Sequence, residues 1–327
     1  MPSDRDHSYI QQYAGTDHKR ADRSKGTHMK THEIGKKIKN NKEIKYDKRT
    51  KYDKEIKYDK RTIYNKNGFP VVSVAVLALI ISGCLFADLI TTREPGYMDL
   101  VNYTKAPGTE FLFGTDTMGR DIFSCIWYGG RVSISIGIIS TIISTVIAVI
   151  YGSLSAMAGD IADTCMMRFV EILLSIPTLL LVVFLQAVMG DATVASISVV
   201  IGLTSWCSIA KIVRTEVKKL KNSEYVIAAK CMGGGFGYIL RRHLVPNFIP
   251  SIMFMVVMNV RAAIVAESTL SFMGIGLPVE VISWGSMLSL AQNALMTDAW
   301  WIIIIPGAFL VTFLMCLTNV GHWIQSR

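Results

Sequence analysis

Long stretches of this 327-residue sequence lack charged residues altogether. Four windows contain no Asp, Glu, Lys or Arg, namely Phe69–Ala87, Val132–Ala158, Ala192–Ala210 and Ala299–Ser326. Each window holds an apolar run of about 20 residues, the length that a helix needs to cross about 30 Å of hydrocarbon. The apolar content of 51% would also suit a large water-soluble core. The absence of charge within the windows therefore decides the class, and it predicts an integral membrane protein.

Two further apolar runs contain isolated charges. Phe169–Met189 includes Glu171, and Phe248–Ile275 includes Arg261 and Glu267. With these runs, the sequence predicts an all-α polytopic membrane protein with about six transmembrane helices. The expected spans cover residues 69–90, 132–156, 166–188, 193–212, 249–273 and 300–323.

The sequence also lacks motifs that would suit a membrane enzyme. It has no HExxH, no GxSxG and no pair of intramembrane aspartates, and His32-Glu33 lacks a second histidine four residues after the first. It has no GxxxxGKS/T motif, so we expect no nucleotide site and no cofactor in this chain. An integral membrane enzyme or an ion-gradient-driven transporter stays the alternative of another class, although the internal repeats typical of such transporters are not visible.

Metal sites and disulfides are not expected either. The six cysteines include no CxxC pair, and most of them lie in or beside apolar runs, where a thiol behaves as a small hydrophobe. Of the six histidines, four precede residue 33, His243 lies in a basic connection and His322 lies at the end of the last span. None is placed for a nickel site in the middle of the membrane.

The net charge of +9 belongs entirely to the amino-terminal region. Residues 1–66 hold 19 Lys and Arg against 10 Asp and Glu, and the repeat KEIKYDKRT occurs at 42–50 and again at 54–62. Such low-complexity sequence cannot form a core, so residues 1–68 are expected to be a basic, disordered cytoplasmic tail. Residues 1–29 end in a sequence typical of a cloning junction, which predicts a native start at Met29. Contact with anionic lipid is an alternative role, and no nucleic-acid partner is expected.

The positive-inside rule gives an orientation. The connection 211–242 contains eight Lys and Arg, whereas 276–298 contains none. Basic connections stay in the cytoplasm. Both termini and the 211–242 connection are therefore predicted to be cytoplasmic, and residues 91–131 to form an extracytoplasmic segment of a transmembrane domain spanning 69–327.

The basic connection has a distinctive pattern. An amphipathic helix is predicted over Glu216–Met232, three glycines then break it, and a second helical piece over Tyr238–Leu244 is expected to end at Pro246-Asn247. Small residues between the two pieces permit another protein to approach the backbone closely. An ordinary basic loop is the alternative interpretation.

This connection resembles the EAA signature of the permease subunits of binding-protein-dependent ATP-driven importers. The matching runs are Glu224–Ala229, Gly233 and Arg242–Asn247, with Ile227 in place of the signature glutamate. The resemblance implies that residues 214–248 form a coupling hairpin that docks into an ATPase subunit. The residues implied to contact the ATPase are Glu224, Ala228, Ala229, Gly233, His243, Pro246 and Asn247.

A second resemblance narrows the family. Residues 113–124 and 128–133 are similar to the outer segment of the second (C-type) permease of dipeptide, oligopeptide and nickel ABC importers. Gly114 and Gly119 allow tight turns, and Asp116 or Asp121 can cap a short helix lying at the membrane surface. We expect a structural role or contact with a binding protein, carried by Gly114, Asp116, Gly119, Arg120 and Asp121.

The resemblance extends from about residue 69 to the end, and it implies a complete assembly. The chain would adopt the type I ABC importer permease fold in a bacterial or archaeal cytoplasmic membrane, in contact with membrane lipid. Its partners would be a second homologous permease, two ATP-binding subunits that hold ATP and Mg, and an extracytoplasmic ligand-binding protein. The implied substrates are oligopeptides or dipeptides, with nickel or a metal–chelator complex as the alternative.

Charged residues within the spans are candidates for the translocation path, because an isolated charge in hydrocarbon must face protein or water. The candidates are Arg261, Glu267 and Glu171. Arg261 is expected either to meet a ligand carboxylate or to form an ion pair with one of the two glutamates or with the partner permease.

Overall fold

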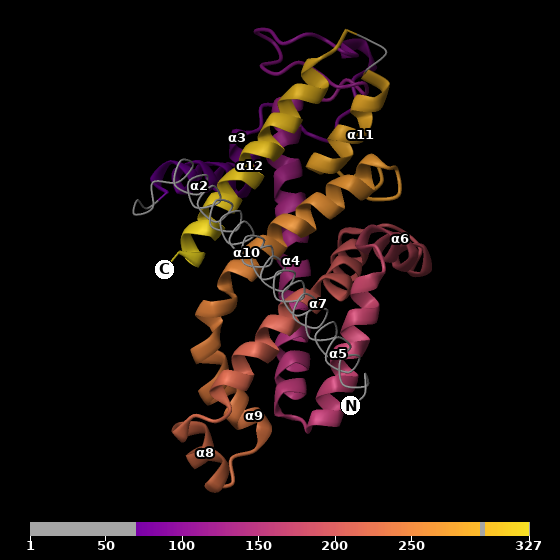
Figure 1. Ribbon diagram of the computed structural model, residues 1–327. Helices are drawn as coiled ribbons and strands as arrows, with labels where there is room; N and C mark the ends of the chain where they lie inside the picture. Colours follow the sequence, from indigo (N-terminus) through magenta and orange to yellow (C-terminus); the bar gives the residue numbers. More distant parts are fainter. Residues whose placement is uncertain (1–69, 295–297, 327) are drawn as a thin grey trace, which may run out of the picture. The chain divides into compact units, whose positions relative to one another are not determined.

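The computed structural model describes residues 70–294 and 298–326, so the predicted basic tail lies outside the described residues. Within these ranges the regular structure is helical apart from one isolated bridge between Thr115 and Asp121, which confirms the all-α prediction (Figure 1). The elements are α2 (Val71–Leu85), α3 (Ala87–Ile90), η1 (Leu100–Asn102), α4 (Ile122–Met157), α5 (Asp160–Ser175), α6 (Thr178–Met189), α7 (Val194–Leu220), α8 (Glu224–Cys231), α9 (Phe236–Ile239), the π-helical η2 (Leu240–Leu244), α10 (Val245–Phe272), α11 (Trp284–Ala294) and α12 (Trp301–Gln325).

The predicted count of about six spans is only roughly matched. Among the described residues, four helices are long and apolar enough to cross a membrane: α4, α7, α12 and the continuous helix Phe236–Phe272. Helices α5 and α6 make a fifth span only if they are counted together, because they bend by 90° at the break between them. Pro177 causes this bend, since it disfavours helical geometry at the preceding residue, and Ile176 is extended. The first expected span is the shorter apolar helix α2, 15 residues long, followed by α3.

The apolar segments alternate in direction between two ends of the body formed by residues 69–327. At one end, which we call the loop end, Nη1 of Arg120 donates to the carbonyl of Val279 at 3.0 Å, and Nε1 of Trp301 donates to that of Thr115 at 3.2 Å. At the other, the hairpin end, α8 and α9 lie beside the turn after α4 (Figure 1), and Nζ of Lys221 donates to the carbonyl of Ala156 at 3.0 Å. These contacts place the start of α4, the segment after α10 and the start of α12 at one end, and the ends of α4 and α7 at the other.

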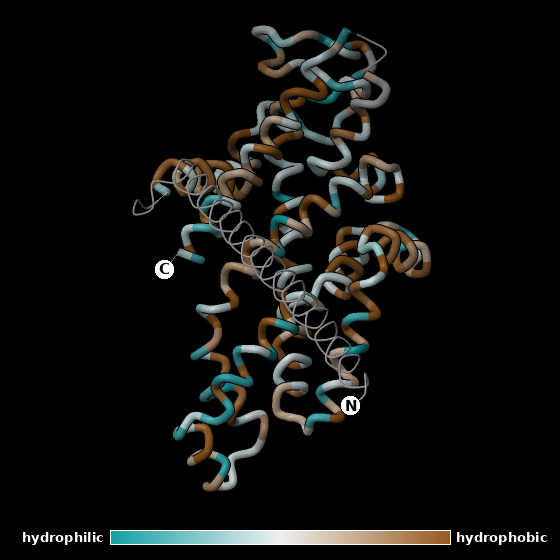
Figure 2. Tube along the Cα trace, in the orientation of Figure 1, coloured by the Kyte–Doolittle hydropathy of each residue, from teal (hydrophilic) through white to brown (hydrophobic). Residues whose placement is uncertain are grey.

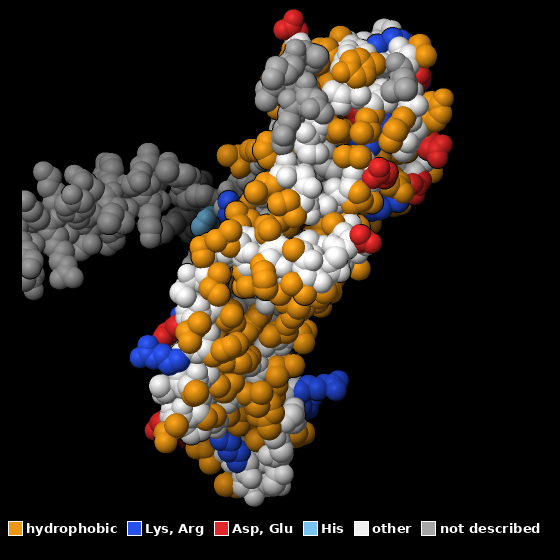
Figure 3. All heavy atoms as spheres, turned by 90° about the vertical axis from the view of Figure 1, so that its right-hand side faces the viewer, with side chains coloured by type: hydrophobic (Ala, Val, Ile, Leu, Met, Phe, Trp, Pro, Cys, Tyr) orange, Lys and Arg blue, Asp and Glu red, His pale blue; other side chains and the backbone are white. Residues whose placement is uncertain are grey.

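Small residues bring α4 and α7 together. A Cβ at Gly152 would lie 2.6 Å from the carbonyl oxygen of Ala210, and a Cβ at Gly202 would lie 2.8 Å from the Ile143 side chain. Close backbone contact of this kind is the usual basis of helix association in lipid, where burial of apolar surface gives little driving force. Figure 2 shows hydrophobic residues along the helices and hydrophilic residues prominent at the hairpin end. On the face seen in Figure 3, acidic and basic side chains lie mainly toward the two ends.

Two predicted helix boundaries differ from the structure. The helix of the second span was expected to start at about residue 132, but α4 begins at Ile122, where the Asp121 side chain caps it, and the extracytoplasmic position of residues 91–131 stays a prediction. The hairpin was expected to contain one helix over Glu216–Met232 and to end at Pro246-Asn247, but α7 stops at Leu220 and α8 starts at Glu224. Pro246 does not end the helix: the π-helical η2 leads directly into α10, and Pro246 is the second residue of α10.

Candidate functional site

Helix α8 presents a small apolar face away from the body. Val226 and Ala229 are buried, with 0% and 2% exposure, in a hydrophobic cluster shared with α5, α7 and η2. Ala228 and Ile227 are exposed on the opposite side, and Met232 just after the helix is 82% exposed. Of the two alanines expected at a docking surface, Ala228 therefore faces outward, whereas Ala229 packs inward.

Gly233 ends α8 and turns the chain. Its φ of +82° lies in the left-handed region that favours glycine. The N–H of Gly233 donates to the carbonyl of Lys230 and that of Gly234 to the carbonyl of Ala229, both at 2.9 Å. This pair of hydrogen bonds is a Schellman motif, which satisfies carbonyls that a helix end would leave free. The glycine recognised in the sequence is thus the residue whose positive φ ends α8.

The second half of the hairpin is continuous with a span. α9 and the π-helical η2 lead directly into α10, and the His243 ring lies between those of Tyr225 and Tyr238, with centroids 6.1 Å and 5.6 Å away. Pro246 and Asn247 are exposed, and Glu224 is exposed at the start of α8. Six of the seven predicted docking residues are thus at least partly accessible at the hairpin end, and Ala229 is the exception.

A charged cluster that sequence reasoning missed supports the hairpin. Asp163 of α5 is 4% exposed and accepts hydrogen bonds at 2.5 Å from Arg214 and Lys218 of α7 and at 2.6 Å from Ser155 of α4. One carboxylate therefore joins three helices immediately before α8 begins. The signal in the sequence was the spacing of Arg214 and Lys218, which are four residues apart and so share one face of a helix.

The structure does not bring together the three candidates for the translocation path. Glu171 lies on α5 and forms an ion pair with Arg168 at 2.9 Å. Arg261 is exposed on α10, and within residues 70–294 and 298–326 it forms no ion pair with either glutamate. The alternatives that paired it within this chain are therefore wrong in the described part. A path role for these residues stays a prediction.

Glu267 is fully buried, with 0% exposure, and it contacts serine hydroxyls. It accepts hydrogen bonds from Ser283 at 2.7 Å, Ser271 at 3.0 Å and Ser133 at 3.2 Å, with Ser268 at 3.4 Å. Ser133 belongs to α4 and Ser283 precedes α11, so the carboxylate joins α10 to both. A Cβ at Gly285 would lie 2.9 Å from Oε1 of Glu267. Glycine at that position lets α11 pack directly on this cluster.

The motif at the loop end forms a buried ion pair and tight turns. Asp116 and Arg120 are 5% and 2% exposed, their side chains pair at 2.8 Å, and Asp116 also accepts from the backbone N–H groups of Met118 and Arg120. Gly119 has a φ of +74°, and a Cβ there would lie 1.8 Å from the carbonyl oxygen of Asp99. Gly114 also has positive φ, at +77°. The predicted tight turns and the aspartate cap are present, but the helix that Asp121 caps is the long α4 and not the short surface helix that was expected.

No group of three or more His, Cys, Asp or Glu side chains in the described ranges is arranged to hold a metal ion. The six cysteines are free thiols, four of them buried.

Comparison with known proteins gives a consistent result. A family described as binding-protein-dependent transport system inner membrane component matches residues 148–327. The oligopeptide transport system permease protein OppC of Bacillus subtilis is 36% identical over 256 residues, covering 78% of this chain and 82% of that protein. The dipeptide transport system permease protein DppC of the same organism is 34% identical over 261 residues, covering 80% and 81%. A solved chain of the MetNI methionine ABC transporter matches 61% of this chain and 93% of its own length, with 16% identity and a TM-score of 0.49.

Proposed function

Because the chain is a multi-pass membrane protein that belongs to the family of binding-protein-dependent transport system inner membrane components, we propose that it is a permease subunit of an ATP-driven importer. In this proposal it forms part of the translocation path for oligopeptides or dipeptides. The names of its relatives, oligopeptide and dipeptide permeases at 36% and 34% identity, support that substrate class.

The observation that carries the proposal is the exposed face of α8. A helix of eight residues is held to the body by Val226 and Ala229, while Ala228, Ile227 and Met232 face outward. Single apolar residues at a surface are ordinary, but a small patch on a protruding helix is typical of a protein interface. The occupant we propose is an ATP-binding subunit.

The remaining partners follow from the same proposal. Two ATP-binding subunits at the hairpin end would hold ATP and Mg, since this sequence has no phosphate-binding motif. A second permease would complete the path, and a ligand-binding protein would dock at the loop end. The hairpin end and both termini would face the cytoplasm, as the eight Lys and Arg of residues 211–242 favour.

In the mechanism we propose, motion of the hairpin is transmitted through the hydrophobic cluster beneath α8 and through the Asp163 cluster. An ATPase that moves α8 would displace the hydrophobic cluster beneath it, which includes residues of α5 and α7. The Asp163 cluster would oblige α4, α5 and α7 to move together, because separating them would leave charges unpaired. The bundle would then alternate between two arrangements around a central path.

Replacing Ala228 with Arg is expected to prevent association with the ATPase subunits, because a long charged side chain would occupy the small exposed face. Copurification of the ATPases with the tagged permease measures this, and we expect a loss of at least tenfold. Ala162, another exposed alanine near the hairpin end but on α5, supplies the matched control A162R, which should retain the complex. Full recovery of the ATPases with A228R would overturn the docking assignment.

Substrate class requires a separate measurement. Deleting the gene for this chain in the native host is expected to abolish uptake of labelled di- and oligopeptides. Expression of the intact chain should restore uptake. Uptake of labelled nickel in the same strains tests the alternative. Loss of nickel uptake with unchanged peptide uptake would contradict the peptide assignment while leaving the importer assignment in place.

A further inference from the structure

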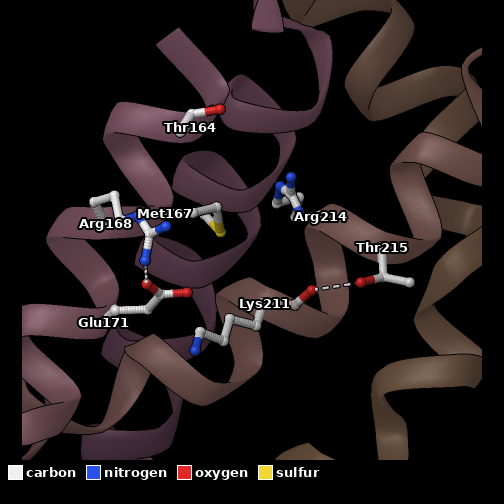
Figure 4. Close-up of a pocket in the computed structure, with 7 residues that line it drawn as sticks. All are labelled: Thr164, Met167, Arg168, Glu171, Lys211, Arg214 and Thr215. Atoms are coloured by element: carbon white, nitrogen blue, oxygen red, sulfur yellow. Dashed lines mark hydrogen bonds and ion pairs between the residues drawn. The ribbon is translucent and has the colours of Figure 1, made fainter. Parts of the chain in front are cut away.

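A polar pocket of about 400 Å³ lies between α5 and α7, on the hairpin side of the uncharged segments (Figure 4). Three of its lining residues are cations, Arg168, Lys211 and Arg214, and one is an anion, Glu171. The remaining lining residues are Thr164, Met167 and Thr215. The pocket belongs neither to the hairpin surface nor to the serine-lined site of Glu267.

One of the three cations has no anionic partner among the described residues. Arg214 pairs with Asp163, and Arg168 pairs with Glu171. The Lys211 ammonium extends toward the Glu171 side of the pocket (Figure 4) but forms no hydrogen bond or ion pair in the described ranges. Lys211 is partly buried, and a partly buried ammonium without an anion is unfavourable next to hydrocarbon, so an external anion would find a favourable site here.

The position of the pocket along the membrane normal can be estimated from α4. Gly152 of α4 packs against the backbone of Arg214, so the pocket lies at its level. Arg131 lies 21 residues earlier on the same helix, and no charged residue stands between them. That interval spans about 32 Å at 1.5 Å per residue, close to the thickness of a hydrocarbon core of about 30 Å. The pocket therefore lies about one hydrocarbon thickness away from Arg131, a position that suits contact with lipid headgroups on the hairpin side.

The surface beside the pocket is apolar. Phe169 and Ile172, neighbours of the two paired side chains on α5, are 51% and 64% exposed. A cationic recess next to an exposed apolar helix face fits a molecule with an anionic head and a hydrocarbon tail. A free anion would use the first of these features and leave the second without a role.

We propose that this pocket binds the phosphate headgroup of an anionic phospholipid from the leaflet on the hairpin side. Lys211 supplies the unpaired charge, Arg168 and Arg214 donate from either side, and the acyl chains lie along α5. Basic pockets between transmembrane helices are suited to such headgroups. A bound lipid at this position would contact α5 and α7, the helices that Asp163 joins.

The test is a lipid titration of the purified transporter complex, followed by native mass spectrometry with short-chain phosphatidylglycerol as the probe. Lys211→Met should weaken binding about fivefold, the effect of one Lys near an anionic surface. Glu171→Gln, which removes the competing carboxylate, should strengthen it. Lys219→Met is the control, because Lys219 is on α7 but is exposed and pairs with Glu216 outside the pocket.

Two further probes distinguish the possible sources of the anion. Phosphatidylcholine should bind equally to the protein and to K211M, since it carries no net charge. Inorganic phosphate at millimolar concentration should not displace phosphatidylglycerol. Equal phosphatidylglycerol affinity in the protein, K211M and E171Q would overturn the site, and displacement by phosphate would replace the lipid with a soluble anion. Neither result bears on transport, so the proposed function is tested independently.

Discussion

Replacing Asp163 with Ala is expected to reduce substrate transport at least tenfold, while the hairpin surface itself stays intact. The substitution removes the acceptor that Arg214, Lys218 and Ser155 share. Hydrogen bonds to a charged group contribute about 1.5–3 kcal/mol, and both cations are partly exposed, so the folded state should lose about 2–3 kcal/mol. Uptake in cells, together with the apparent melting temperature of the purified complex, measures the two effects.

The matched control for this prediction is Asp160→Ala. Asp160 lies one turn earlier on α5 and is exposed, so its loss should cost only the modest interaction of a carboxylate with a helix N-terminus, about 0.3–1 kcal/mol. A double-mutant cycle of D163A and R214A should be strongly non-additive, because the two side chains share one interaction. Additive effects would mean that the joint does not act as a unit.

Replacing Arg120 with Met is expected to destabilise the loop end severely. The Arg120 and Asp116 side chains are 2% and 7% exposed, and the guanidinium also donates to the carbonyl of Val279. Breaking a buried ion pair by removing one partner costs about 3–5 kcal/mol, because the other charge stays buried without compensation. We expect a lower apparent melting temperature and poor recovery of the protein from membranes.

Arg93→Met is the comparison for that result. Arg93 pairs with Glu110 at 3.4 Å in the same outer segment, but both side chains are about half exposed, at 44% and 54%. Hydrogen bonding from Lys105, with a smaller contribution from Arg93, lowers the pKa of Glu110. An exposed pair of this kind contributes little to stability, because water and salt screen it. Similar losses for R93M and R120M would show that burial does not determine the effect at this end.

The sequence predicts well that the chain is a membrane protein and in which order its apolar segments follow. The reason is that the absence of charge can be recognised in each window without knowledge of the tertiary structure. The turns at Gly114 and Gly119 and the cap at Asp121 are also local, and all three are confirmed. Helix boundaries were less accurate. Nothing in the composition of 216–232 marks a break at Lys221–Ser223, which follows from how α7 and α8 pack in three dimensions.

The arrangement of charged residues was the hardest feature to predict. Arg261 and Glu267 are six residues apart on one helix, yet Glu267 faces serines of α4 and of the segment before α11. Asp163 and Arg214 are 51 residues apart, and only the packing of α5 on α7 brings them into contact. Partners so distant in sequence leave no periodic pattern, so the Asp163 cluster could be identified only from the structure.

One continuous helix, from Phe236 to Phe272, connects the hairpin to Glu267. Its first turns form part of the hairpin, and its last turns carry Glu267. A rod of 37 residues is about 55 Å long, so a tilt of a few degrees at one end displaces the other by several ångströms. Because no loop interrupts this connection, the hairpin and the serine-held carboxylate of Glu267 belong to one continuous helix.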